Sequence, residues 1–453
     1  MTCSPTGPIL TAAEMRAAEL TAGCSLSELM NRAGGAIAEA VWRYGCGRPA
    51  LFLCGPGNNG GDGYVAARLL KARGLDVRVA ALRESRADIA RAARALWGGA
   101  VEALGSAAPA PVLVDCLFGT GLARPLEADV RAAMFRLSGA AKFRIAVDLP
   151  SGLGTDDGGD MGAVGADLTL ALGSLKPAHL LQPGAALCGT VRVADIGIDA
   201  RSQLWVNSRP QMSVPSPSSH KYKRGYVAMV GGAMGGATML AARAAMPLAG
   251  YVTVIGARRV GPDALVHRRW EEVAEDSRVG AMLVGPGLGR DEAAQERLNR
   301  VLATGHALVL DADALKLTTP EKLRDRGGCT IVTPHEGEFS ALFGVLPGGK
   351  VDRARAAALL ARSIVILKGA DTVIAHPDGR AMIQPFASGW LATAGSGDVL
   401  AGIVAAQLAE RHDPFWAACE AVWLHAEAAR LAGPGLTADA LPRHIPRALA
   451  ACL

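Results

Sequence analysis

Two glycine-rich segments, each ending in an aspartate or holding one, carry the residues best suited to chemistry in this 453-residue chain. The first is Gly-Pro-Gly-Asn-Asn-Gly-Gly-Asp-Gly at 55–63, and the second is Ala-Gly-Ser-Gly-Asp at 394–398. Each follows an extended or loop-like stretch and precedes a helical pattern, so its backbone N–H groups are offered to an anionic ligand. Because more than 300 residues separate them, they predict two active sites.

The first segment combines backbone freedom with polar side chains. The apolar run Leu51–Cys54 would deliver it to the carboxyl edge of a sheet, where open α/β folds bind ligands. Its five glycines permit positive φ angles and close approach of the backbone. Asn58, Asn59 and Asp62 add oxygens that could hold a ribose, a hydroxyl or a hard cation. A tight structural turn is the alternative, although a turn needs fewer of these residues.

Two more acids end predicted strands in the same half of the chain. Asp115 precedes Cys-Leu-Phe-Gly-Thr-Gly, and Asp148 precedes Leu-Pro-Ser-Gly, which contains Ser151. Buried strand-end acids are costly unless they are paired or bind a metal, so these two predict a cation site or a catalytic carboxylate. Helix capping is the alternative, and it suits Ser151 better than Asp115. Lys176 fits a site and a surface position equally well.

These segments together resemble the NAD(P)H-hydrate epimerases over about residues 11–198. The resemblance rests on Gly-x-Gly-Asn-Asn-Gly-Gly-Asp-Gly, Val-Asp-x-Leu-x-Gly-Thr-Gly and Val-Asp-x-Pro-Ser-Gly. It implies contacts to a hydrated nicotinamide nucleotide from Asn58, Asn59, Gly60, Gly61, Asp62, Gly119, Thr120, Gly121, Leu122, Ala123, Arg124, Pro125 and Asp148. It also implies that a potassium ion is bound by Asn59, Asp115 and Ser151. Asp148 would be catalytic, transferring a proton at the epimerising carbon. The chain departs from the family at Leu172, where an aromatic residue is usual.

The second segment suits phosphoryl transfer. The amides of Gly395–Gly397 could stabilise the negative charge of a transferring phosphoryl group, and Asp398 could accept a proton from a substrate hydroxyl. Alone the motif is weak, because Gly and Asp are common at helix N-termini.

Companion motifs at other predicted strand ends strengthen the second site. Lys368 lies in Leu-Lys-Gly-Ala-Asp-Thr, His335 lies in Thr-Pro-His-Glu-Gly-Glu, and a glycine turn occupies 285–289. For His335, a backbone hydrogen bond in a loop is an equal alternative. The acids of Leu-Asp-Ala-Asp at 310–313 could orient a metal or cap the next helix.

As a set, these motifs resemble the ribokinase-like fold and the ADP- or ATP-dependent NAD(P)H-hydrate dehydratases, over about residues 221–449. The resemblance implies hydrate contacts from Ala237, Gly287, His335 and the catalytic Asp398. It implies nucleotide contacts from Lys368, Gly369, Ala370, Asp371, Thr372, Ser388, Gly389, Trp390, Leu391, Ala392, Thr393, Ala394, Gly395, Ser396 and Gly397. ADP, or ATP, would be the co-substrate, together with Mg²⁺. Two departures are Ala-Ser-Gly-Trp at 387–390, in place of Gly-Asn-Pro-Gly, and Ser396 in place of Thr.

The elements that must position these residues alternate between short apolar runs and Ala-rich helical stretches, which predicts parallel sheets. The predicted strands are Ala50–Cys54, Val77–Leu82, Val112–Leu117, Arg144–Leu149, Ala166–Leu172, Tyr226–Val230, Tyr251–Ile255, Ala281–Val284, Ala307–Leu310, Thr330–Val332 and Ile364–Leu367. The predicted helices include Tyr64–Arg73, Arg86–Trp97, Glu127–Leu137, Val399–Glu410 and Pro414–Leu431, with capping boxes at Thr11 and Ser25. We expect an epimerase domain at 8–205, a proline-containing linker at 206–222 and a dehydratase domain at 223–450. The fold class is α/β, a Rossmann-like three-layer domain followed by a ribokinase-like domain.

Composition limits the partners. Half the residues are apolar and the net charge is only +5, with no basic stripe interleaved with aromatics, so nucleic acid is not expected. Nine cysteines without a Cys-x-x-Cys pair favour a reducing compartment. No secretory signal and no long apolar run is apparent, so we expect a cytoplasmic protein without a membrane partner. We also expect a homo-oligomer acting on hydrated NADH and NADPH.

The sequence therefore predicts a bifunctional metabolite-repair enzyme that epimerises the R and S hydrates and dehydrates the S form. A kinase of a small vitamin-like alcohol is one alternative, because it would share the C-terminal fold and anion site. A non-catalytic binding module in the N-terminal half is another.

Overall fold

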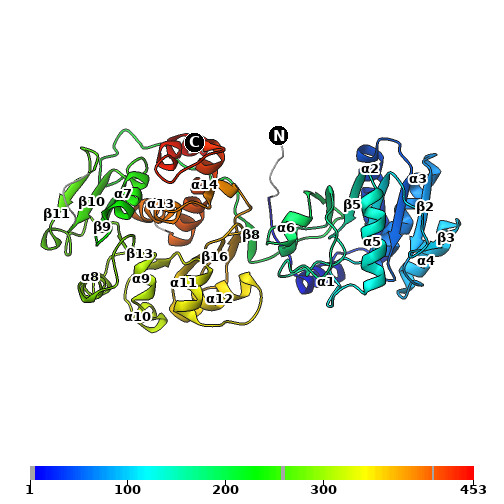
Figure 1. The fold of residues 1–453 in the computed structure, drawn as a ribbon, viewed down its shortest axis with the longest axis horizontal. Helices are drawn as coiled ribbons and strands as arrows, with labels where there is room; N and C mark the ends of the chain where they lie inside the picture. The colour runs from blue at the N-terminus through cyan, green and yellow to red at the C-terminus, as the bar shows by residue number, and fades with distance from the viewer. Residues whose placement is uncertain (1–5, 257–260, 411–412) are drawn as a thin grey trace. The chain divides into compact units, whose positions relative to one another are not determined.

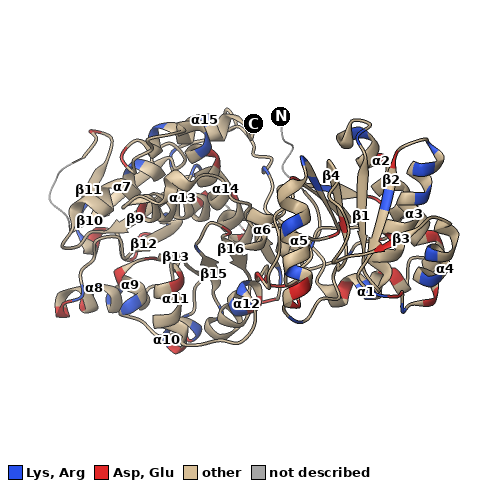
Figure 2. Cartoon of the chain, turned by 45° about the vertical axis from the view of Figure 1, so that its right-hand side comes forward, with Lys and Arg blue, Asp and Glu red and all other residues tan. Residues whose placement is uncertain are grey.

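The computed structural model describes residues 6–256, 261–410 and 413–453. The chain forms two compact units, Met1–Val206 and Asn207–Leu453. Each unit is built on its own α/β sheet (Figure 1). Lys and Arg are interspersed with Asp and Glu along the helices of each unit (Figure 2). No helix among the described residues is long and apolar enough to cross a membrane.

The sheet of the first unit is parallel throughout, in the order β3-β2-β1-β4-β5-β6-β7. Its strands are β1 (Ala50–Cys54), β2 (Val77–Ala81), β3 (Val101–Ala103), β4 (Val112–Cys116), β5 (Phe143–Val147), β6 (Leu168–Leu172) and β7 (Thr190–Ala194). The short strand β8 (Leu204–Val206) follows in the chain and is not part of this sheet. The five predicted strands are confirmed to within two residues at each end. Strands β3 and β7 were not predicted, because they lie at the sheet edges and are only partly buried.

Helices cover both faces of this sheet, as the three-layer prediction requires. They are α1 (Ala12–Leu20), α2 (Leu26–Gly45), α3 (Asn58–Ala72), α4 (Asp88–Trp97), α5 (Ala128–Ala140) and α6 (Gly184–Leu187). Alternate residues of β1 decide the faces: Phe52 packs with α2, α3 and α4, whereas Leu51 and Leu53 pack with α5. Both predicted capping boxes, at Thr11 and Ser25, are present.

Helix α3 begins at Asn58, six residues before the predicted start, so most of the first glycine segment is helical. None of its glycines has a positive φ, contrary to the freedom inferred from sequence. Their role is close packing: a β-carbon at Gly60 would lie 2.0 Å from the Gly55 carbonyl oxygen, and one at Gly63 would lie 2.9 Å from the Cys116 side chain. The many glycines indicated a loop in the sequence, but the segment is a helix that needs small residues on its packed face.

The sheet of the second unit runs β11-β10-β9-β12-β13-β14-β15-β16-β17. Its strands are β9 (Tyr226–Val230), β10 (Tyr251–Ile255), β11 (Val266–Arg268), β12 (Ala281–Val284), β13 (Leu308–Leu310), β14 (Thr330–Val332), β15 (Ile364–Leu367), β16 (Val373–Ala375) and β17 (Ala381–Ile383). The pairs from β11 to β15 are parallel, and β16 and β17 are antiparallel. All six predicted strands are confirmed, and the three-residue strands β11, β16 and β17 were not predicted.

Helices α7, α13 and α14 lie on one side of this sheet, and α8 to α12 lie on the other (Figure 1). Their bounds are α7 (Gly235–Ala245), α8 (Glu292–Leu302), α9 (Asp313–Lys316), α10 (Pro320–Arg324), α11 (Glu336–Phe343), α12 (Lys350–Ala361), α13 (Ser396–Glu410), α14 (Pro414–Ala432) and α15 (Ile445–Ala450). Helix α13 is buried along most of its length and begins at Ser396, so Asp398 lies in its first turn.

Candidate functional sites

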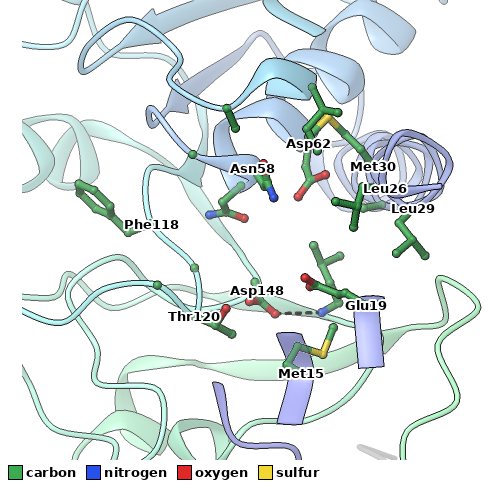
Figure 3. A pocket seen from close by; sticks show the side chains of 18 of the residues that line it. Met15, Glu19, Leu26, Leu29, Met30, Asn58, Asp62, Phe118, Thr120 and Asp148 are labelled. Carbon is green, nitrogen blue, oxygen red and sulfur yellow. Dashed lines mark hydrogen bonds between the residues drawn. The ribbon is translucent and has the colours of Figure 1, made fainter. Parts of the chain in front are cut away.

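A cavity of about 500 Å³ opens in the first unit beside the carboxyl ends of β1, β4 and β5 (Figure 3). The predicted hydrate contacts that line it are Asn58, Asn59, Asp62, Gly119, Thr120, Gly121, Leu122 and Asp148. Gly60, Gly61, Ala123, Arg124 and Pro125 are not among its lining residues. Gly61 packs against Met30 instead, where a β-carbon would lie 2.4 Å from the methyl group.

Asp148 directly follows β5 and is held in an unusual backbone conformation. Its φ of 66° lies in the left-handed region, which costs a non-glycine residue about 1–3 kcal/mol where the surroundings enforce it. Its N–H donates to the Leu170 carbonyl over 2.8 Å. The Leu172 N–H donates to Oδ1 over 3.2 Å, and Lys176 Nζ forms an ion pair with the same oxygen. These contacts aim the carboxylate at the cavity.

Lys176 is fully buried, which settles the question that the sequence left open. Besides Asp148, its ammonium donates to the Leu172 carbonyl over 2.7 Å. A buried lysine without a counter-charge would be strongly destabilising, so the ion pair is integral to the unit. Lys176 therefore belongs to the site and not to the surface.

His179 ties the lysine and the acid together. Its Nδ1 accepts the Lys176 N–H over 2.9 Å, so in the neutral ring Nε2 carries the proton and donates to the Asp148 carbonyl over 2.7 Å. Burial and the neighbouring Lys176 lower the pKa of His179 to about 4. The ring is consequently neutral near pH 7, and its two hydrogen bonds hold the backbones of Lys176 and Asp148 in a fixed relation.

Two further acids face the same space as Asp148, as Figure 3 shows for Asp62 and Glu19. Burial raises the pKa of Asp62 well above its usual range, and the charge of Asp148 raises it further. Burial and Asp148 also raise the pKa of Glu19, although Lys176 opposes this. The cavity thus combines a lysine-paired carboxylate with two carboxyls that hold their protons more tightly than usual.

Two of the three predicted potassium ligands, Asp115 and Ser151, are in direct contact, and the third, Asn59, bonds to the end of β5. Ser151 Oγ donates to Asp115 Oδ1 over 2.7 Å, and its N–H donates to Oδ2 over 2.8 Å. Asn59 Nδ2 donates to the Val147 carbonyl over 3.3 Å. Burial raises the pKa of Asp115, and the hydrogen bonds from Ser151 oppose the shift. Among the described residues Asp115 has no ion-pair partner, so a monovalent cation would fit the charge of this oxygen-rich group.

In the second unit a cavity of about 440 Å³ lies beside β15, β17, α13 and α14. The predicted nucleotide contacts that line it are Lys368, Gly369, Ala370, Thr372, Ser388, Gly389, Leu391, Ala392, Ser396 and Gly397. Asp371, Trp390, Thr393, Ala394 and Gly395 are not among the lining residues. Asp371 instead forms an ion pair with Lys350 over 2.5 Å, and the Trp390 side chain is exposed.

Asp398 lies beside this cavity near two other acids, Asp311 and Glu338, and Lys368 supplies a single positive charge among the three. Lys368 Nζ lies 2.8 Å from Asp311 Oδ1 and 3.7 Å from Glu338 Oε2. Burial acts to lower the pKa of Lys368, but Asp311 and Glu338 outweigh it and the pKa is raised. Burial and the charge of Asp311 raise the pKa of Asp398 to about 6, while Lys368 opposes them. Asp398 is therefore a carboxyl that changes charge near neutral pH.

His335 caps helix α11, the backbone role that the sequence left as an alternative. Its Nδ1 accepts the N–H groups of Gly337 over 3.0 Å and Glu338 over 3.2 Å. The ring also lines the cavity, so capping holds it in place there. Of the acids at 310–313, Asp313 binds the Gly289 N–H over 3.0 Å and the Arg290 guanidinium over 2.7 Å. Neither acid at 311 and 313 caps helix α9, and no cluster of three or more metal-ligating side chains of the His, Cys, Asp or Glu types occurs among the described residues.

Ala237 and Gly287 lie on neighbouring elements of this unit. Ala237 is in the first turn of α7, and Gly287 follows β12 with a φ of 66°. A β-carbon at Gly287 would lie 2.2 Å from the Met234 carbonyl oxygen, so only glycine fits the turn. The Met234 N–H donates to the Gly287 carbonyl over 2.9 Å, which joins the two segments.

The two halves match different family models. Residues 26–178 match the YjeF-related protein N-terminus, and residues 227–449 match the NAD(P)H-hydrate dehydratases. A bifunctional NAD(P)H-hydrate repair enzyme of Thermofilum pendens is 34% identical over 93% of this chain and 92% of its own. The chain belongs to the bifunctional NAD(P)H-hydrate repair enzymes. The repair enzyme of Mycobacterium tuberculosis is 37% identical over 84% of this chain and 81% of its own.

Among solved structures, an ADP/ATP-dependent NAD(P)H-hydrate dehydratase from Bacillus subtilis, co-crystallized with ATP/Mg²⁺, is similar to part of this chain. It is 29% identical, with a TM-score of 0.48, and the match covers 54% of this chain and 95% of that one. The predicted membership of the repair-enzyme family, with an epimerase half and a dehydratase half, is confirmed.

Sequence reasoning missed several residues of this repair enzyme's cavities. His179 and Glu19 line or support the first, and Gln384 and His425 line the second. Burial lowers the pKa of His425 to about 4, and its Nε2 contacts the Ser396 carbonyl over 3.0 Å. The apolar residues around Lys176 and His179 were the one available signal, because a lysine is fully buried only where it is paired, and these neighbours suggest burial.

Proposed function

We propose that the first unit interconverts the R and S hydrates of NADH and NADPH, and that the second dehydrates the S form with ADP or ATP. The observation that carries this proposal is the presence of two separate cavities in a chain of this family, one lined by Asp148 in the first unit and one beside Asp398 in the second. We assign the epimerase to residues 8–205 and the dehydratase to 223–450, with 206–222 between them. The free cysteines suit a reducing compartment, so we place the enzyme in the cytoplasm, as a homo-oligomer.

In the first unit, Asp148 is the residue we propose for proton transfer at the epimerising carbon. Its ion pair with Lys176 holds the carboxylate in place at the cavity, where it can accept a proton. Asp62 and Glu19 hold their protons more tightly and face the same cavity, so either could return one. Asn58, Asn59 and the turn at Gly119–Leu122 would hold the hydrated ring.

A potassium ion would be held by Asn59, Asp115 and Ser151, which fits the unpaired charge of the buried Asp115 carboxylate. The bound ion would also hold the loop that follows β4 in place. Its proposed ligand Ser151 accepts the Phe118 N–H of that loop at Oγ over 2.9 Å. Phe118 begins the turn toward Gly119 and Thr120, which line the cavity.

In the second unit, Asp398 would take the proton of the substrate's 6-hydroxyl as that oxygen attacks the terminal phosphoryl group of the nucleotide. The amides at the start of α13, Gly395–Gly397, would stabilise the phosphoryl oxygens. Phosphate would then leave C6 while a proton leaves C5, which restores the dihydropyridine ring. Mg²⁺, held mainly by the nucleotide phosphates, would neutralise their charge.

An absorbance assay at the reduced-nicotinamide band tests the proposal. The full chain is given a mixture of R and S hydrates with ADP, with ATP, or with neither. Complete recovery of NADH or NADPH with a nucleotide supports both activities, and recovery of the S fraction alone contradicts the epimerase assignment. Hydrate that persists with either nucleotide would overturn the dehydratase assignment and favour a kinase of another alcohol.

A further inference from the structure

A third cavity, in the second unit, is strongly basic and lies apart from the predicted nucleotide contacts. Its volume is about 600 Å³, and it lies at the carboxyl ends of β9, β10 and β11, beside α8. Its lining includes four arginines, Arg268, Arg269, Arg297 and Arg300, and the only acid among its described lining residues is Glu272. Such an excess of guanidinium groups around one hollow is suited to a ligand with several negative charges.

Two of these arginines are not neutralised by acids. Arg297 makes no side-chain hydrogen bond and no ion pair with any residue in the described parts of the chain. Among the described residues, the Arg268 side chain hydrogen-bonds only to the neutral Tyr251 hydroxyl, with Nη2 at 3.1 Å and Nε at 3.3 Å. Both side chains are partly buried, so their charges are available to a ligand in the cavity.

The other groups suit a planar, hydrogen-bonding ligand. Arg300, one turn from Arg297 on α8, lies 4.6 Å above the Trp270 ring and 3.6 Å from Glu271. Trp270 also lines the cavity and offers an aromatic surface. His267 Nδ1 is buried without a hydrogen-bond partner among the described residues. An adenine ring with attached phosphates would use all of these features.

This cavity is one short segment away from the proposed hydrate site. Gly231 lines it and follows β9, and three residues later the Met234 N–H donates to Gly287 over 2.9 Å. Strands β9 and β12 are neighbours, so the ends of β9 and β10 lie roughly 5–10 Å from that of β12 along the sheet edge. A dinucleotide whose nicotinamide lies near Gly287 could extend its other half into the cavity.

We propose that this basic cavity binds the adenosine phosphate half of the NAD(P)H hydrate, with Arg297 and Arg268 contacting its phosphate groups. The inference rests on the proposed dehydratase function of the same unit. The same chemistry could come from a free adenine nucleotide bound as an effector, and the experiment separates these sources.

The test compares Arg297→Gln and Arg268→Gln in the full chain with the matched control Arg324→Gln, a partly buried arginine on α10, outside this cavity, that pairs with its neighbour Asp325. Dehydration is measured with the S hydrate of NADPH and with the S hydrate of reduced nicotinamide mononucleotide, which lacks the adenosine half. We expect kcat/KM for the NADPH hydrate to fall roughly tenfold or more in each cavity variant, because each loses a charged hydrogen bond. The value for the truncated hydrate and the KM for ADP should stay unchanged.

Adenosine 2′,5′-bisphosphate supplies the second arm. It should compete with the NADPH hydrate in the wild type and bind more weakly to Arg297→Gln. Equal losses for full and truncated hydrates, no loss for either, or inhibition that is not competitive with the hydrate would each overturn the inference. A wild-type chain that dehydrates neither substrate would instead refute the dehydratase function itself, so the two failures are distinguishable.

Discussion

The two candidate sites share a glycine-rich helix start, a nearby lysine and a proposed catalytic aspartate, but they use the lysine differently. In the first unit, the fully buried Lys176 pairs with the proposed catalytic residue, Asp148. In the second, Lys368 pairs with Asp311 and lies 3.7 Å from Glu338. Asp398 is left in acidic surroundings, where burial and Asp311 raise its pKa to about 6.

This difference shows that the partner of the lysine, more than the glycine motif, decides what each acid can do. A carboxylate paired with a buried ammonium is favoured in its ionised form. A carboxyl with a pKa near the working pH can both take and release a proton, which suits a base that must recover in every cycle. The following changes should break or sharpen the contrast.

Exchanging each acid for its amide should separate the two activities most strongly. Asp398→Asn should slow dehydration of the S hydrate by about 10²–10⁴-fold, because the general base is lost. Asp148→Asn should slow epimerisation, measured on purified R hydrate, by a similar factor. Each variant should retain the other activity. Slow dehydration of purified S hydrate by Asp148→Asn would show that the sites are not independent.

Removing the lysines should reveal which ion pair is more deeply buried. Lys176→Met leaves the buried Asp148 unpaired and should lower the free energy of unfolding of the first unit by about 3–5 kcal/mol. Lys368→Met should cost less, because Asp311 keeps its bond from Thr333 Oγ1 at 2.7 Å. Hydrogen exchange at increasing urea concentrations measures the free energy of unfolding of each unit in both variants. The double variant Lys176→Met/Asp148→Asn should recover much of the loss, and a failure to recover would contradict the ion-pair explanation.

Adding a methyl group to the helix starts should affect the first unit more than the second. Gly60→Ala would place its β-carbon 2.0 Å from the Gly55 carbonyl oxygen, so we expect a loss of about 1–3 kcal/mol. At Gly397 the nearest atom is Nζ of Lys368 at 3.3 Å, the end of a long side chain that can shift slightly, and a smaller loss is expected. Gly57→Ala is the control, because no atom lies within 4 Å of its β-carbon position. Equal melting temperatures for all three variants would refute the packing role.

The pH dependence of dehydration should show the smallest effect and report Asp398 directly. The pKa of this acid is raised to about 6, so it holds a proton below that pH and is available as a base above it. We expect kcat/KM to fall about tenfold per pH unit below about pH 6 and to level off above it. Lys368→Met should move the midpoint upward, because Lys368 opposes the shift. An unmoved midpoint would assign the titration to another group.

Much of the architecture was predictable, because strands buried on both faces leave clear apolar runs. The bounds of β1, β9, β10, β12, β14 and β15 agree with the predictions at both ends. Helix starts in the glycine segments were placed too late, since glycine indicates a loop unless the packed neighbour is known. The structure places the predicted Asp148 in one cavity and Asp398 beside the other, whereas Glu19 on α1 and His179 were not predicted, because they come from segments without a recognisable motif.

The sequence by itself determined the two α/β units, their strands and the two acids, since apolar periodicity and strand-end motifs are local properties. Only the tertiary structure decided that Lys176 is buried against Asp148, and that Lys368 is shared between Asp311 and Glu338. It alone also gathered the arginines of β11 and α8 around one cavity. The reason is physical: burial and charge pairing depend on which distant segments meet, and these set the ion pair of Asp148 and the raised pKa of Asp398.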